Sequence, residues 1–175
     1  MSRAFVFPGQ GSQEVGMGKE LATAFPAAKQ VFEEVDDSLN QNLSNIIFNG
    51  PDEELILTSN AQPALMAVSM AVIRVLEEEV GIVVSEKVRF VAGHSLGEYS
   101  ALTAAGSLAL ADSSKLLKAR GLYMQKAVPV GKGAMAAILG LDLESVEEIA
   151  SQAAENMTCD VANDNSEGQI VLFID

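Results

Sequence analysis

The motif Gly93-x-Ser95-x-Gly97 is the segment of the chain best suited to covalent chemistry. A nucleophilic serine has to stand exposed at a sharp strand-to-helix turn, and glycines two residues before and after it remove side chains that would clash there. The start of the following helix offers free backbone N–H groups and a positive dipole end to a developing oxyanion. Apolar segments at 88–92 and 98–105 flank the motif. We therefore predict a nucleophile at Ser95; the alternative is an incidental glycine-rich turn.

His94 is the only histidine of the chain, but its position does not suit a general base. Side chains of adjacent residues diverge at a sharp turn, so the imidazole is poorly placed to take the Ser95 proton. In proteins with such an elbow the base comes later in the chain, and no histidine follows Ser95. We interpret His94 as a residue that packs beside the site.

Arg120 falls on the apolar side of a helix that the sequence predicts from about residue 112 to 127. On an ideal helix it lies about 140° from Lys115, in the same arc as Leu117 and Met124. A guanidinium that faces inward cannot lose its charge and needs an anionic partner. Two partners remain open: a structural Asp or Glu, or a substrate carboxylate held by two parallel hydrogen bonds.

Composition excludes several classes of protein and partner. The 175 residues carry a net charge of -13, so nucleic acid and anionic membranes are poor partners for the surface as a whole. No apolar run reaches the ~18 residues that a membrane span needs, and the apolar stretch before Pro8 is too short for a secretory signal. With Cys159 as the single cysteine, an internal disulfide is impossible and no metal site is expected. A cytoplasmic protein is the expectation.

The first part of the chain is predicted to alternate strands and helices, as in an α/β fold. Residues 3–7 and 88–92 indicate two short buried strands. Between them, Ser59 or Asn60 is expected to cap a long apolar helix that carries Pro63 in its first turn.

The charge distribution indicates a boundary near residue 132. All 11 Lys and Arg lie in residues 1–132, whereas residues 133–175 carry 9 acidic residues and no basic one. After the boundary the pattern predicts a strand, a helix opened by Asp142 or Ser145, and two strands, at residues 134–141, 142–156, 159–162 and 169–174. This order matches the first four elements of a ferredoxin-like βαββαβ unit.

Three separated segments together resemble the malonyl-CoA:acyl carrier protein transacylases, the acyltransferases of bacterial-type fatty acid synthesis. They are Phe-Val-Phe-Pro-Gly-Gln-Gly-Ser-Gln at 5–13, Gly-His-Ser-Leu-Gly-Glu-Tyr-Ser-Ala-Leu at 93–102, and Arg120. Shorter segments that also resemble this family lie at 62–65, 133–137, 163–165 and 168–169. The similarity extends to about Val171.

This resemblance implies a fold. Residues 1–132 would form an α/β-hydrolase-like large subdomain, incomplete at its C-terminal side. Residues 133–175 would begin an inserted, incomplete ferredoxin-like small subdomain with βαββ order. The chain would then correspond to the N-terminal portion of a transacylase.

The resemblance also implies roles for individual residues. Ser95 would take the malonyl group from malonyl-CoA as an ester and pass it to the phosphopantetheine thiol of acyl carrier protein. The backbone N–H groups of Gln10 and Leu96 would form the oxyanion hole, and Arg120 would bind the malonyl carboxylate. Further residues expected to line the substrate site are His94, Asn163 and Asn165. No cofactor is expected beyond the two substrates.

One departure from the family bears on activity. Family members are longer, and their catalytic histidine lies beyond the small subdomain, whereas no histidine follows Ser95 here. General-base assistance is typically worth ~10²–10⁴ in rate, so we expect this chain to be a poor catalyst as it stands.

Two other readings remain: a serine thioesterase or esterase, and a non-catalytic fragment that binds CoA. A basic stretch at 115–132 is a hypothetical contact for the acidic carrier protein.

Overall fold

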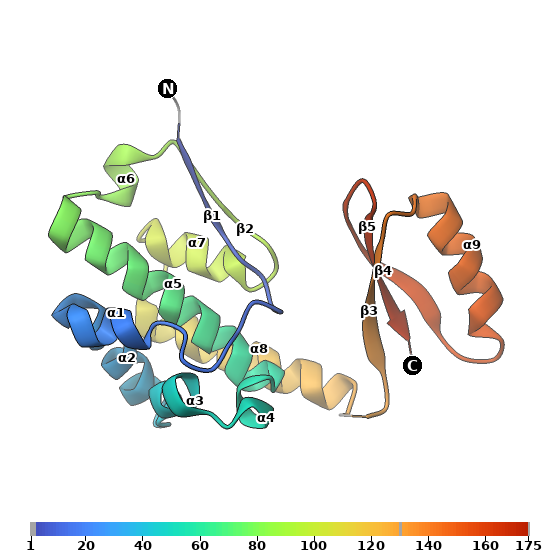
Figure 1. The fold of residues 1–175 in the computed structure, drawn as a ribbon, viewed down its shortest axis with the longest axis horizontal. Coiled ribbons are helices and arrows are strands. Elements are labelled where there is room, and N and C mark those ends of the chain that lie inside the picture. Colours follow the sequence, from blue (N-terminus) through green and yellow to red (C-terminus); the bar gives the residue numbers. More distant parts are fainter. Residues whose placement is uncertain (1–2, 130, 175) are drawn as a thin grey trace. The chain divides into compact units, whose positions relative to one another are not determined.

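The computed structural model describes residues 3–129 and 131–174. Contacts divide the chain into two compact units, the first ending at Met124 and the second beginning at Gln125. Each unit combines helices with a small sheet (Figure 1), so the fold class is α/β, as expected. The domain limits of 1–132 and 133–175 drawn from the charge distribution stay a prediction.

The first unit contains two strands and eight helices among the described residues. In chain order they are β1 (Ala4–Phe7), α1 (Lys19–Ala24), α2 (Pro26–Leu39), α3 (Leu43–Asn49), α4 (Asp52–Leu55), α5 (Thr58–Val80), α6 (Val84–Lys87), β2 (Phe90–Gly93), α7 (Gly97–Ala104) and α8 (Leu110–Ala127), whose last residues belong to the second unit.

The two strands of the first unit pair in parallel, with Ala4 opposite Phe90 and Phe7 opposite Gly93. Parallel strands end at the same edge of a sheet, so the loop after Phe7 and the turn after Gly93 emerge side by side. This register joins two segments that are more than eighty residues apart in the sequence. Both belong to the predicted site.

Helix α5 forms the centre of the core. Its apolar residues contact an apolar stripe of α2, and Phe32 of that stripe meets Phe48 edge to face at 4.8 Å between ring centroids. The helix begins at Thr58 with Leu57 as its N-cap and no side-chain cap. The expected cap by Ser59 or Asn60 is therefore wrong, because the helix starts two or three residues earlier than a cap at either residue would place it.

The expectation that both strands are buried is also wrong for part of each strand. Helix α7 packs against both strands, and Phe7 joins the core. Val6 and Phe90, in contrast, are 75% and 59% exposed. Successive side chains of a strand point to opposite faces of the sheet, and among the described residues only one face is covered.

The second unit is built from one helix and three strands among its described residues. They are β3 (Ala134–Leu139), α9 (Leu143–Ala154), β4 (Cys159–Ser166) and β5 (Gln169–Ile174), paired antiparallel in the order β3-β5-β4. The side chain of Asp142 caps α9 by accepting a hydrogen bond from the Ser145 N–H at 2.8 Å. A small core of Val146, Ala150, Cys159, Ile170 and Leu172 joins α9 to the sheet.

Candidate active site

Ser95 lies at the turn between β2 and α7, as the motif predicted, and its side chain is exposed. Its φ of 55° is in the left-handed region, which non-glycine residues seldom adopt. Two backbone hydrogen bonds between residues three apart stabilise the turn: the Gly97 N–H donates to His94 O at 2.9 Å, and the Glu98 N–H donates to Ser95 O at 3.2 Å. Backbone strain of this kind persists only where the surrounding structure enforces it.

The two glycines of the motif are required by close backbone contacts. A β-carbon at Gly93 would overlap the Gly97 carbonyl group. A β-carbon at Gly97 would lie 2.5 Å from the carbonyl oxygen of Phe7, at the end of β1. The turn can therefore press against the neighbouring strand only because both residues lack a side chain.

Two backbone N–H groups lie in the adjacent turns that follow β1 and β2. Leu96 immediately follows Ser95 as the N-cap of α7, with its side chain buried. Gln10 follows Pro8-Gly9, and its side chain donates to Thr58 Oγ1 at 3.3 Å. Neither N–H group has a hydrogen-bond partner among the residues that the structure describes. They are free to donate to a ligand, and their assignment as the oxyanion hole stays a prediction.

Arg120 reaches Ser95 across 25 residues of sequence. Its Nη2 donates to Ser95 Oγ at 2.9 Å, and its Nη1 donates to Gln62 Oε1 at 2.7 Å. The side chain is half-buried, as expected for an arginine on the apolar side of its helix. The two ion pairs found in the described part of the chain join Lys29 to Glu33 and Arg74 to Glu77, so a structural carboxylate does not neutralise Arg120 there.

Gln62 is a site residue whose role the sequence reasoning missed. It lies on α5, is completely buried, and donates from Nε2 to Met124 Sδ at 3.3 Å while its Oε1 accepts from Arg120. The available signal was its occurrence inside the apolar run at 61–67. A buried polar side chain in such a run needs a partner inside the protein.

The remaining predicted residues take different positions. The His94 side chain is exposed, and its backbone N–H donates to Phe7 O at 3.3 Å, which ties the turn to β1. Asn163 and Asn165 lie on β4 in the second unit, with exposed side chains. Their roles, and that of His94, in substrate binding stay predictions.

Lys118 belongs to the basic stretch but points into the first unit. Its Nζ donates to Gln41 Oε1 at 2.7 Å and to Asn60 Oδ1 at 2.8 Å. Burial lowers the pKa of this ammonium group. Because its protons are used internally, Lys118 does not suit a docking surface, whereas Lys115 is exposed.

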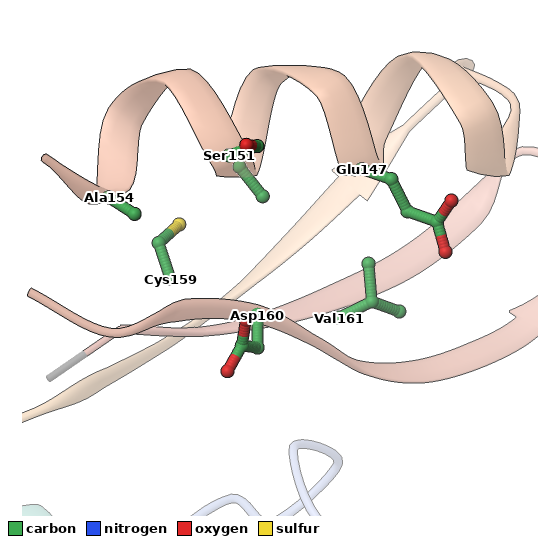
Figure 2. A pocket seen from close by; sticks show the side chains of 7 residues that line it. Glu147, Ser151, Ala154, Cys159, Asp160 and Val161 are labelled. Atoms are coloured by element: carbon green, nitrogen blue, oxygen red, sulfur yellow. The ribbon is translucent and has the colours of Figure 1, made fainter.

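A separate open cavity of about 640 Å³ lies in the second unit, between α9 and β4. Figure 2 shows Cys159 and Val161 of β4 beneath Ser151 and Glu147 of the helix. None of the site residues predicted from the sequence line it. No cluster of three or more His, Cys, Asp or Glu residues suited to a metal occurs in residues 3–129 and 131–174. The group around Ser95 is therefore the stronger candidate site.

Comparison with known proteins decides the family. The family model for the acyl transferase domain matches residues 4–172. The chain belongs to the acyl transferase domain family. Its resemblance to the malonyl transacylases is confirmed by the relatives described next, and the chain fits the N-terminal portion of such proteins.

Both sequence and structure comparisons find malonyl transacylases. The chain is 51% identical over 170 residues to the malonyl CoA-acyl carrier protein transacylase of Bacillus subtilis (strain 168), covering 97% of this chain and 52% of that protein. A crystal structure of acyl-carrier-protein-S-malonyltransferase from Bartonella henselae aligns with a TM-score of 0.92 and 61% identity, over 99% of this chain and 55% of that one.

A third match includes a partner protein. It is a malonyl-transacylase in complex with its type II PKS acyl-carrier protein, with a TM-score of 0.89 and 45% identity over 99% of this chain and 55% of that one. The chain thus spans about half the length of the relatives it matches. Separately, none of the helices described is both long and apolar enough to cross a membrane.

Proposed function

We propose that the chain carries the nucleophile and the carboxylate-binding part of a malonyl transferase active site. The reaction is transfer of the malonyl group from malonyl-CoA to the phosphopantetheine thiol of acyl carrier protein, a step of fatty acid biosynthesis. The observation that carries this proposal is the 2.9 Å hydrogen bond from Arg120 to Ser95 Oγ, made by a guanidinium with no carboxylate partner among the described residues. The named activities of the B. subtilis and B. henselae relatives support it.

The substrate carboxylate explains why a half-buried arginine lies beside a nucleophile. Guanidinium and carboxylate form two parallel charge-assisted hydrogen bonds, and this geometry fixes the orientation as well as the affinity of an acyl group. A malonyl group places its carboxylate two bonds from the thioester carbonyl carbon. Arg120 would therefore hold the carboxylate and so bring that carbon to Ser95.

The transfer proceeds in two displacement steps. The Ser95 Oγ–carbon bond forms, the carbon–sulfur bond of the thioester breaks, and the serine proton goes through a base to the departing CoA sulfur. The carrier thiol then gives its proton to the base and attacks the ester carbon, so that a carbon–sulfur bond forms and the Ser95 Oγ–carbon bond breaks. The base returns the proton to Ser95 Oγ. The N–H groups of Gln10 and Leu96 would stabilise the oxyanion in both steps. No cofactor takes part in this scheme.

The general base would come from outside the described residues. Within them, the hydrogen bond that Ser95 Oγ makes is the one from Arg120, which is a donor and cannot accept the serine proton. General-base assistance typically raises a rate ~10²–10⁴-fold. We therefore propose that the acylation rate of this chain without a base is lower by that factor.

The same proposal extends to the architecture and to the partner. The parallel β1–β2 pair with α7 fits an α/β-hydrolase-like large subdomain, and the β3-α9-β4-β5 order fits the start of a ferredoxin-like small subdomain.

For acyl carrier protein, an electrostatic contact from the part of the basic stretch that lies in the first unit would use exposed Lys115 rather than Lys118. The carrier complex of the third relative supports this choice of partner.

The test is a three-way assay of the chain with malonyl-CoA. After prolonged incubation, mass spectrometry should find a malonyl adduct on Ser95 that is absent from Ser95→Ala. Addition of phosphopantetheinylated acyl carrier protein should move the adduct to the carrier. Release as malonate would instead indicate a thioesterase, and CoA binding without any adduct would indicate a non-catalytic fragment.

A further inference from the structure

Helices α5 and α8 approach each other closely beside Arg120, and Figure 1 shows the two helices running past each other. A β-carbon at Gly121 would lie 2.5 Å from Ser59 Cα and 2.6 Å from Thr58 O. The α8 backbone thus rests on the first turn of α5. Arg120 is adjacent to Gly121, so its side chain extends from α8 at a point where side chains of α5 can reach it.

Two parallel connections cross this contact. Lys118 donates to Asn60 Oδ1 at 2.8 Å, and Arg120 donates to Gln62 Oε1 at 2.7 Å. In both, a cation on α8 meets a neutral amide oxygen on α5, with the partners two residues apart on each helix. The two connections differ in one respect, because Arg120 continues to Ser95 whereas Lys118 continues to Gln41.

The amide of Gln62 has a fixed orientation. The side chain is fully buried, with Nε2 directed at Met124 Sδ and Oε1 at Arg120. A reversed amide would turn its donors toward the guanidinium, which has only donors, and leave the buried groups unsatisfied. In this orientation Gln62 presents an acceptor to Nη1 of Arg120.

We propose that Gln62 is the positioning residue that sets the preference of the site for acyl groups bearing a carboxylate. It fixes the guanidinium of Arg120 beside Ser95, and as a neutral acceptor it leaves the positive charge available to the substrate. This inference rests on the proposed function. A glutamate at the same position would keep the hydrogen bond to Arg120 but neutralise the positive charge of the guanidinium. The contribution of positioning can therefore be separated from that of the charge.

The experiment compares Gln62→Met, Gln62→Glu and the matched control Lys118→Met in the full 175-residue chain. Dissociation constants for malonyl-CoA and acetyl-CoA are measured by calorimetry, and their ratio is the readout. We expect Gln62→Met to reduce the malonyl preference about tenfold, the scale of one lost hydrogen bond to a charged group. Gln62→Glu should abolish the preference, while Lys118→Met should lower the melting temperature and leave the ratio unchanged.

A second measurement tests the inference independently of substrate binding. Side-chain NMR of the Arg120 guanidinium reports its rotation without any substrate, and Gln62→Met should accelerate that rotation whereas Lys118→Met should not. An unchanged binding ratio with unchanged rotation in Gln62→Met would overturn the inference, as would a full malonyl preference in Gln62→Glu. If the parent chain itself binds the two thioesters equally, the proposed function fails, and the NMR result still decides whether Gln62 positions Arg120.

Discussion

The guanidinium of Arg120 donates to Ser95 Oγ at 2.9 Å although Ser95 lies in the turn after β2 and Arg120 lies on α8. Ser95 is placed by the turn after β2, and Arg120 by the approach of α8 to α5. A cation at this distance from a hydroxyl favours negative charge on its oxygen and on whatever binds next to it. The contact thus joins the proposed acyl acceptor to the proposed carboxylate receptor.

Replacing Arg120 by alanine should remove the discrimination between malonyl-CoA and acetyl-CoA. Hydrogen bonds to charged groups contribute about 1.5–3 kcal/mol each, so we expect the affinity for malonyl-CoA to fall at least tenfold while that for acetyl-CoA changes little. Calorimetric titration with each thioester measures both. Arg74→Ala, which removes a surface arginine paired with Glu77, is the control and should leave both affinities intact.

Replacing Gly97 by alanine should destabilise the first unit as well as the site. The new β-carbon would press on the Phe7 carbonyl, and forcing extra atoms into packed regions typically costs about 1–3 kcal/mol. Urea denaturation measures the change. Gly81→Ala is a useful comparison, since its β-carbon meets open space and the cost arises only from the left-handed φ of 69°. A smaller loss for Gly97→Ala than for Gly81→Ala would contradict the packing described here.

Ser100 should tolerate replacement by alanine. Its Oγ is buried on α7 and has no hydrogen-bond partner in the described part of the chain. Removing an unsatisfied buried hydroxyl relieves a desolvation cost of about 1–3 kcal/mol, so stability should stay the same or rise. Ser113→Ala provides the contrast, because it removes the buried hydrogen bond of 2.6 Å between Ser113 Oγ and Thr103 Oγ1 and leaves Thr103 with only its bond to Tyr99 O. Equal losses from both substitutions in chemical denaturation would refute this view.

Asp142 should make the second unit sensitive to acid. The hydrogen bonds from Ser145 lower the pKa of this carboxyl group below its ordinary value of 3.8. The unfolded chain therefore binds the proton more readily, and the stabilisation is present above pH 3.8 and is lost as the pH falls through the lowered pKa. Melting curves at pH 7 and pH 3 should show a smaller difference for Asp142→Asn than for the parent chain. An unchanged difference would exclude Asp142 as a source of the acid sensitivity.

Much of the site could be predicted from the sequence because its determinants are local. The Gly-x-Ser-x-Gly spacing predicted the turn. The helical period placed Arg120 on an apolar side, and its side chain is half-buried, although Met124 of the same arc is exposed and Lys118 is half-buried too. The same local reasoning proposed Asp142 or Ser145 as the start of a helix, and Asp142 is the residue that caps it.

The failures concern relationships between distant segments. Nothing in the local pattern shows that Gln62 meets Arg120, since 58 residues separate them and the contact depends on how α5 and α8 approach. The start of α5 was misplaced because Leu57 caps it without a polar side chain. The exposure of Val6 and Phe90 could not be read from their apolar character, because burial of a strand depends on which other elements cover its faces.

The central claim is most directly tested by competition between two thioesters for Ser95. The chain is incubated with equal concentrations of malonyl-CoA and acetyl-CoA, and the acyl group on the Ser95 peptide is quantified by mass spectrometry. The account predicts that malonyl is the main adduct on Ser95 and that Arg120→Ala shifts the ratio towards acetyl. Equal acylation by both thioesters in the parent chain, or an adduct that persists in Ser95→Ala, would contradict it.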